Sequence, residues 1–71
     1  MAAAQRILEL RLEKELTQRE LAWLLDVNPI TVSRWERGEA HPSALVRVRL
    51  ARFFEVASSE FENDDAGERV A

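Results

Sequence analysis

Apolar residues along this chain recur at intervals of three and four positions, which is the spacing of an amphipathic α-helix. No segment alternates apolar and polar residues for long enough to indicate a β-strand. The pattern therefore predicts an all-α fold. Five helices are expected, at about 3–14, 17–25, 28–37, 43–54 and 59–63.

Start and stop signals support the second and third of these helices. Thr17 and Glu20 have the spacing of a capping box, in which each side chain accepts a hydrogen bond from the other residue's backbone N–H. Asn28 followed by Pro29 is typical of a cap and a first helical residue, because proline has no N–H to satisfy there. Gly38 is typical of the residue just past a helix end.

The expected core is formed by one face of each helix. Trp35 could in principle stack on a base, but its spacing from Val32 favours a core position. Ser59 with Glu62 offers a second candidate capping box, for the fifth helix. Lys14 shares a side of the first helix with Ile7 and Leu10. The residues expected on inward faces are Ile7, Leu10, Leu21, Ala22, Leu25, Val32, Trp35, Ala44, Val48, Leu50, Ala51, Phe54 and Phe61.

Length and charge bound the organisation of the chain. Its 71 residues allow one small domain with a modest core. The net charge is −3, but residues 1–54 hold nine Lys or Arg against seven acids, whereas residues 55–71 hold one Arg against six acids. The acidity therefore belongs mostly to the end of the chain. We expect a domain over residues 1–63 and an acidic, disordered tail over residues 64–71.

Several classes of function are disfavoured by the composition. The chain has no cysteine and one histidine, His41, so no metal site and no cofactor is expected. No Ser, His and acidic residue share a motif and no glycine-rich phosphate loop is present, so an enzyme is not expected. No apolar run approaches the roughly 18 residues of a membrane span, and a cytoplasmic protein without membrane contact is predicted.

The second and third helices, with the short DVN turn between them, have the proportions of a helix-turn-helix. Asp26 in the turn is expected to have a positive φ, which Asp tolerates better than most residues. The third helix is apolar on one side and carries Arg34 and Arg37 on another. A major groove admits one α-helix, so this polar side is predicted to face double-stranded DNA rather than only solvent.

The pattern ELxxxLTQRELAxLLxVNxxTVSRWERG resembles the phage-repressor and Cro-like family of helix-turn-helix proteins, often called XRE. The resemblance covers roughly Ile7 to Phe61, and its most specific parts are LTQREL and TVSRWERG. It implies a compact five-helix, lambda-repressor-like DNA-binding domain. It also implies a transcriptional regulator, most often a repressor, from a bacterial or phage context.

The resemblance also implies roles for individual residues. Arg34 is the strongest candidate base reader, because a guanidinium can bind guanine O6 and N7 together. Ile30 could contact a thymine methyl group, whereas Pro29 offers shape but no donor. The base-reading positions are thus Pro29, Ile30 and Arg34, and the expected contacts to the DNA backbone are Gln18, Arg19, Asn28, Thr31, Ser33 and Arg37.

Other matched positions are structural. Arg11 and Glu36 correspond to an ion pair that joins the first and third helices in this family. Arg47 stands where an apolar residue is usual, and we interpret it, with Arg49 and Arg52, as a solvated face rather than a phosphate track. Three acidic residues replace glycines usual at helix ends, namely Glu15, Asp26 and Glu55.

Some apolar residues remain once the core is filled, and they indicate a protein interface. The candidates are Leu8, Leu12, Trp23, Leu45, Val46 and Phe53. A homodimer on a palindromic operator is the leading expectation, because this class reads two half-sites through a two-fold axis. The alternative is an interaction module, such as an antitoxin, that binds a partner protein and whose DNA binding is autoregulatory.

Overall fold

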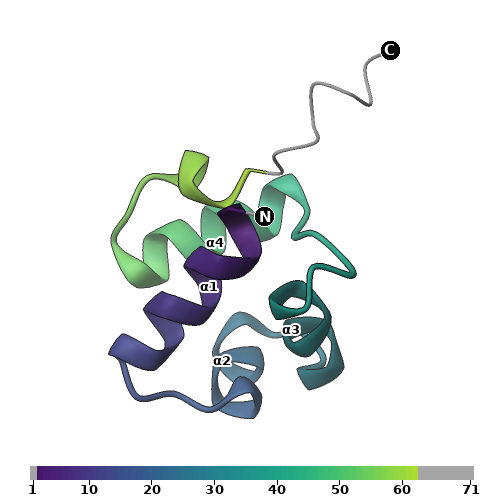
Figure 1. The fold of residues 1–71 in the computed structure, drawn as a ribbon. Coiled ribbons are helices and arrows are strands. Elements are labelled where there is room, and N and C mark those ends of the chain that lie inside the picture. The colour runs from purple at the N-terminus through teal and green to yellow at the C-terminus, as the bar shows by residue number, and fades with distance from the viewer. Residues whose placement is uncertain (1, 63–71) are drawn as a thin grey trace.

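The four α-helices found among the described residues follow the predicted pattern closely. The computed structural model describes residues 2–62, in which α1 spans Ala2–Glu13, α2 spans Gln18–Leu25, α3 spans Pro29–Glu36 and α4 spans Ala44–Phe54 (Figure 1). A 3₁₀ helix, η1, follows over Ser58–Phe61. The all-α class is confirmed.

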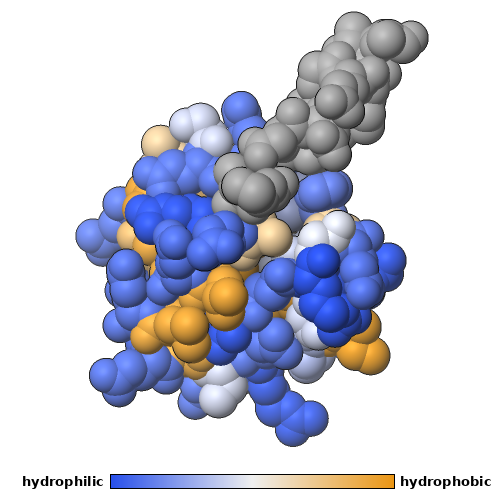
Figure 2. Space-filling model, in the orientation of Figure 1, coloured by the Kyte–Doolittle hydropathy of each residue, from blue (hydrophilic) through white to orange (hydrophobic). Residues whose placement is uncertain are grey.

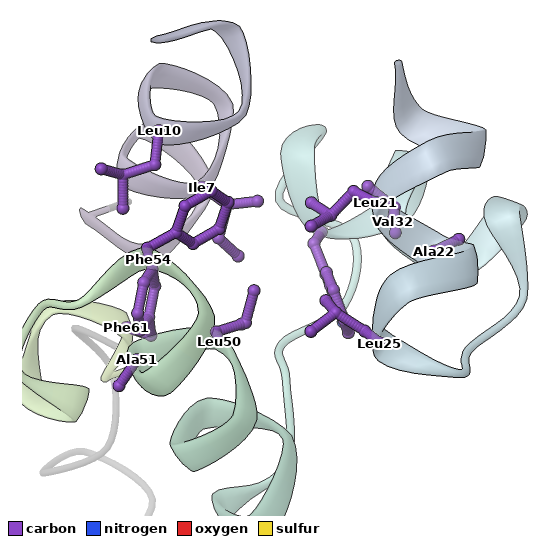
Figure 3. Packing of buried hydrophobic residues seen from close by; sticks show 11 residues of the cluster. Ile7, Leu10, Leu21, Ala22, Leu25, Val32, Leu50, Ala51, Phe54 and Phe61 are labelled. Atoms are coloured by element: carbon purple, nitrogen blue, oxygen red, sulfur yellow. The ribbon is translucent and has the colours of Figure 1, made fainter. Parts of the chain in front are cut away.

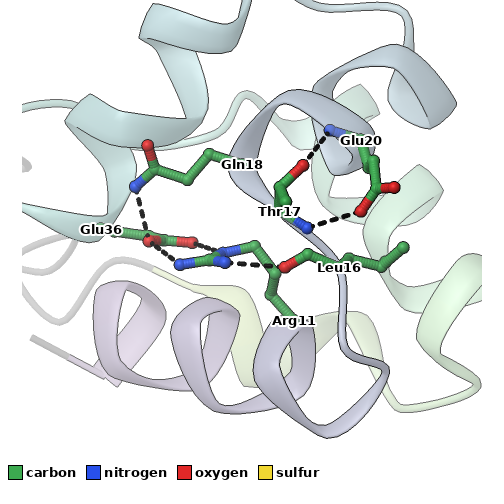
Figure 4. Close-up of polar contacts among 6 residues, drawn as sticks. All are labelled: Arg11, Leu16, Thr17, Gln18, Glu20 and Glu36. Carbon is green, nitrogen blue, oxygen red and sulfur yellow. Dashed lines mark hydrogen bonds and ion pairs between the residues drawn. The ribbon is translucent and has the colours of Figure 1, made fainter.

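Side-chain caps begin three of these helices. The predicted capping box of α2 is present: Glu20 N donates to Thr17 Oγ1 at 3.0 Å, and Thr17 N donates to Glu20 Oε1 at 2.8 Å (Figure 4). Asn28 Oδ1 accepts from the backbone N–H of Ile30, and Ser43 caps α4. These bonds satisfy N–H groups that have no acceptor inside a helix.

All four helices are followed by a residue with left-handed backbone, and only one of these residues is glycine. Glu15, Asp26 and Glu55 have φ of 57°, 61° and 60°, and Gly38 has φ of 76°. The predicted positive φ of Asp26 is confirmed. A side chain in this conformation costs about 1–2 kcal/mol relative to right-handed backbone, so three of the four helix ends are strained.

The core lies where all five helical segments meet. Ile7, Leu21, Val32, Leu50 and Phe61 are completely buried. Figure 3 shows side chains of α1, α4 and η1 facing those of α2 and α3 across this core. Each of α2 and α3 thus packs one side against the core, and its other side faces away from the core.

The predicted fifth helix is wrong in type and bounds. Residues 58–61 form a 3₁₀ helix, with i to i+3 bonds from Glu60 N to Ala57 O and from Glu62 N to Ser59 O. The candidate capping box of Ser59 and Glu62 is absent, since Ala57 is the cap residue. The short segment needs only one tight turn to bring Phe61 into the core, as its complete burial shows.

The predicted inward face of α4 is confirmed in its second half and wrong in its first. Leu50, Ala51 and Phe54 are buried, whereas Ala44 and Val48 are exposed. Arg47 lies on the buried face, half-buried, and its guanidinium donates to the Pro42 carbonyl oxygen at 3.0 Å. A long basic side chain can occupy such a position because its apolar stem packs while its charged end stays hydrated.

Two further expectations concern the ends of elements. Lys14, expected on the same side of the first helix as Ile7 and Leu10, is exposed, and its Nζ lies 5.8 Å from the centre of the Phe53 ring. The predicted acidic tail, 64–71, lies outside the described residues. Within residues 2–62, no helix has the length and apolar character that crossing a membrane requires.

Candidate nucleic-acid interface

The α2 and α3 helices pack directly against each other across a turn of three residues, Asp26 to Asn28. The left-handed Asp26 reverses the chain, and the next N–H, of Val27, donates to the Ala22 carbonyl oxygen at 2.9 Å. Ala22 is completely buried, so its small side chain allows the two helices a close approach. This is the geometry of a helix-turn-helix.

The two faces of α3 have different roles. Val32 and Trp35 are buried in the core, as predicted. Ile30, by contrast, is 66% exposed, and the side chains of Arg34 and Arg37 are 52% and 53% exposed. Since each residue turns about 100° around a helix, these three fall within one narrow arc opposite Val32. The α3 helix therefore presents one apolar and two cationic side chains to solvent.

Behind this face, Arg11, Glu36 and Gln18 form a hydrogen-bonded group that we call the inner cluster. Arg11 donates from Nε and Nη2 to the two carboxylate oxygens of Glu36, at 2.6 and 2.9 Å (Figure 4). The two side chains are only 11% and 6% exposed. Arg11 Nη1 also donates to the Leu16 carbonyl oxygen at 2.8 Å. The expected ion pair between the first and third helices is thus formed.

Charge on Arg11 is favoured by this arrangement. The hydrogen bonds that Arg11 donates to Glu36 raise the pKa of Arg11, and partial burial opposes that rise without reversing it. The ion pair is bidentate and largely shielded from water. It therefore holds α1 and α3 in a fixed relative position.

Gln18, the first residue of α2, joins the inner cluster through its side-chain amide. Its Nε2 donates to Glu36 Oε1 at 2.9 Å, so α3 determines where this amide lies. The Gln18 amide has a second N–H besides the one that bonds Glu36. Gln18 and Arg19 also occupy the first helical positions, whose backbone N–H groups have no acceptor within a helix. The start of α2 therefore combines an oriented amide with free donors, a combination suited to phosphate.

At the far end of α3, Arg34, Arg37, Ser33 and Glu39 form a second group that we call the outer cluster. Arg37 donates from Nε and Nη2 to the two oxygens of Glu39, at 2.9 and 3.0 Å, and from Nη1 to Ser33 Oγ. Arg34 Nε lies 4.0 Å from Glu39 Oε1. The hydrogen bond from Arg37 lowers the pKa of Glu39, with smaller contributions from the charges of Arg37 and Arg34. Glu39 is therefore ionised at neutral pH.

Sequence reasoning missed Glu39. Its position directly after the helix-terminating Gly38 was the available signal, because such a residue folds back on the last turn. The bonds show this motif: Gly38 N donates to Trp35 O at 3.0 Å, and Glu39 N donates to Arg34 O at 2.9 Å.

The remaining predicted contact residues are placed as follows. Asn28 is exposed, and its side-chain oxygen caps α3, which leaves its amide N–H groups for other partners. Pro29 is exposed at the first position of α3. Arg19 is exposed, and Thr31 and Ser33 are half-buried. The fold thus brings the start of α2 and the outer face of α3 together in one helix pair.

The candidate protein-interface residues divide by exposure. Leu12, Trp23 and Leu45 are exposed, Trp23 at 81%. Val46 and Phe53 are half-buried and already pack against the core, and Leu8 is half-buried. Figure 2 shows an apolar area over the part of the surface where α1 runs, with hydrophilic residues around it. Leu24 and Val48 are exposed apolar residues that the sequence analysis did not assign to this set.

Comparison with known proteins supports the geometry. The family model HTH_3, described as helix-turn-helix, matches residues 7–61. The restriction-modification controller protein C.AhdI from Aeromonas hydrophila has a similar structure, with a TM-score of 0.75 and 31% identity over 86% of this chain and 92% of that one. An HTH_3 family transcriptional regulator from Vibrio cholerae gives 0.72 and 27% over 84% of this chain and 34% of that one. Among curated proteins, none matches significantly. The chain therefore belongs to the HTH_3, or XRE-type, helix-turn-helix family of DNA-binding regulators.

Proposed function

We propose that this protein represses transcription by binding a palindromic operator as a homodimer, with α3 of each protomer in the major groove. One observation carries the proposal. The α3 helix is locked from behind by Val32, Trp35 and Glu36, and it exposes Ile30, Arg34 and Arg37 on the opposite side. A rigid helix whose exposed face carries arginine side chains is the element that a major groove accepts.

Base readout falls mainly to Arg34. Its exposed guanidinium can bind guanine O6 and N7 together, a contact worth about 1–3 kcal/mol of discrimination. Ile30 supplies an apolar contact suited to the methyl group of thymine. Pro29 contributes shape at the start of the helix and no hydrogen bond, so specificity depends chiefly on Arg34 and Ile30.

Phosphate contacts come from both ends of the helix pair. Gln18 and Arg19 lie at the start of α2, where free N–H groups and the helix dipole attract an anion. The other proposed phosphate contacts belong to the turn and to α3, and they are Asn28, Thr31, Ser33 and Arg37. Such contacts hold the protein in register on the duplex without reading its sequence.

The proposal of a homodimer rests on the small surface that a single α3 presents to DNA. A single α3 covers only one half-site, and a two-fold axis repeats it about 34–36 Å further along the duplex. The exposed side chains of Leu12, Trp23 and Leu45 supply apolar surface for such an interface. The similarity to a restriction-modification controller protein over 92% of its length supports regulation by a domain of this size.

Selection of bound duplexes from a random DNA pool tests this proposal. We expect enrichment of an inverted repeat with a strongly preferred guanine in each half-site. Reporter expression from a promoter that overlaps the repeat should fall when the protein is present. Enrichment of a single, unrepeated half-site would contradict the homodimer, and a pool without enrichment would contradict sequence-specific binding.

A second candidate function is capture of a partner protein, with DNA binding as autoregulation. The observation that favours it is the 81% exposure of Trp23 on the side of α2 away from the core. Sedimentation of Trp23→Ala separates the two candidates. Loss of the dimer supports the homodimeric regulator. An intact dimer with unchanged DNA affinity and a lost co-purifying protein supports the second candidate.

A further inference from the structure

We propose that Glu39 sets the DNA affinity of this protein by holding Arg37 away from phosphate, so that DNA must displace the carboxylate before Arg37 can bind. The inference rests on the DNA-binding function proposed above. It assigns an inhibitory role to a residue of the interface itself.

Glu39 is fixed beside the cationic face by backbone geometry. Gly38, with φ of 76°, ends α3, and the N–H of Glu39 bonds to the Arg34 carbonyl oxygen at 2.9 Å. This closure turns the chain back on the last turn of the helix. The carboxylate therefore returns to the two arginines that the same helix exposes.

The carboxylate occupies the part of Arg37 that a phosphate would use. A guanidinium binds an anion best through two parallel N–H bonds, and Glu39 accepts both from Nε and Nη2 of Arg37. Ser33 accepts a further bond from Nη1. A phosphate can bind Nε and Nη2 of Arg37 only if the bonds to Glu39 break. A phosphate that binds the remaining N–H groups of Arg37 is attracted less, because Glu39 already neutralises the charge.

This pair is weak enough to open, because both side chains are about half exposed, at 53% and 52%. Exposed pairs of this kind contribute little in water and are screened by salt. Glu39 therefore lowers affinity without abolishing it.

Arg34 is less affected than Arg37. Its Nε is 4.0 Å from Glu39, and the described residues show no hydrogen bond between the two side chains. Removal of the Glu39 charge should consequently strengthen phosphate contact more than base readout. Affinity should rise on all duplexes alike, with base preference unchanged.

The test is the affinity of Glu39→Gln for two duplexes of equal length, the selected operator and a scrambled one, measured by fluorescence anisotropy at several salt concentrations. We expect binding about three- to ten-fold tighter on both duplexes. The slope of log affinity against log salt should steepen by about one per protomer, as for one added phosphate contact.

Glu13→Gln is the matched control. Glu13 is an exposed residue at the end of α1, and no ion pair of Glu13 is found within residues 2–62. The substitution changes net charge by the same amount. Equal gains for Glu13→Gln and Glu39→Gln would assign the effect to net charge and overturn the proposal.

A double variant links the effect to Arg37. In an Arg37→Ala background, Glu39→Gln should gain no more than Glu13→Gln does. A full gain in that background, or weaker binding by Glu39→Gln alone, would overturn the proposal. Failure of the wild-type protein to bind either duplex is a different result, because it rejects the DNA-binding function itself.

Discussion

Two arginine–glutamate pairs lie at the end of α3, and they have the same bidentate geometry in different surroundings. In the inner cluster Arg11 and Glu36 are 11% and 6% exposed, whereas in the outer cluster Arg37 and Glu39 are 53% and 52% exposed. The first pair joins α1 to α3 across 25 positions of the chain, and the second joins residues two apart. The same chemistry therefore joins two helices in one place and lies on the proposed DNA-binding surface in the other.

Exposure decides this division. Removing one partner of a buried pair leaves a charge with neither water nor counter-charge, which is costly. Removing one partner of an exposed pair returns the other to water, which changes stability little. The inner pair can hold the reading helix in place, and the outer pair can exchange its partner for a DNA phosphate.

The largest expected effect belongs to the inner cluster. Glu36→Gln should lower the free energy of unfolding by about 3 kcal/mol, because Arg11 loses its charge partner in a largely buried place. Urea denaturation monitored by circular dichroism measures this. Replacing both residues, in Arg11→Met with Glu36→Leu, should recover much of the loss. If Glu36→Gln lowers the free energy of unfolding no more than Glu39→Gln does, the two clusters do not differ in their contribution to stability.

Next in size is the effect of Arg34→Ala on DNA recognition. Discrimination at one base pair of each half-site should fall by about 1–3 kcal/mol, because a bidentate contact to guanine is lost. Affinities for operators with single base changes measure it, and Arg37→Ala is the control, with a loss that is equal on all of them. If both variants lose affinity uniformly, Arg34 is not a base reader.

A smaller effect is expected at the turn that holds the outer cluster. Gly38→Ala should destabilise the fold by about 1 kcal/mol, because φ of 76° strains any side chain, although an added Cβ would meet no atom within 4 Å. Asp26→Gly, at the same type of helix end, should stabilise by a similar amount. Thermal unfolding compares the two. If both substitutions change stability in the same direction, strain of the left-handed backbone does not determine the stability of these helix ends.

The smallest expected effect on the fold is that of the outer cluster itself. Arg37→Ala and Glu39→Gln should leave the urea midpoint of unfolding within experimental error, because both side chains are about half exposed. Their DNA affinities should nevertheless move in opposite directions. A clear loss of stability in either variant would make the outer pair structural, like the inner one.

Local signals predicted much of this molecule. The caps at Thr17 and Asn28, the positive φ of Asp26 and the burial of Val32 and Trp35 all follow from residue type and spacing. These features depend on neighbours within about one helical turn, so the sequence contains nearly all the information that determines them.

Features that depend on packing were harder to predict. Arg47 lies on the buried face of α4, so apolarity alone wrongly predicted that Ala44 and Val48 point inward. The last helix became a 3₁₀ turn because a single buried Phe61 determines its path. At the candidate interface, the arginines of α3 were evident from the sequence, but the contact of Glu39 with Arg37 depends on the chain folding back past Gly38.

Nuclear magnetic resonance titration of ¹⁵N-labelled protein with the selected operator shows which surface of the helix pair contacts DNA. We predict that chemical shifts change most at the start of α2 and along the outer face of α3, including the Nε–H signals of Arg34 and Arg37. The Nε–H signal of Arg11, in the inner cluster, should change little. Changes centred on the Trp23 side of α2, with the α3 arginines unaffected, would show that DNA does not bind to the outer face of α3.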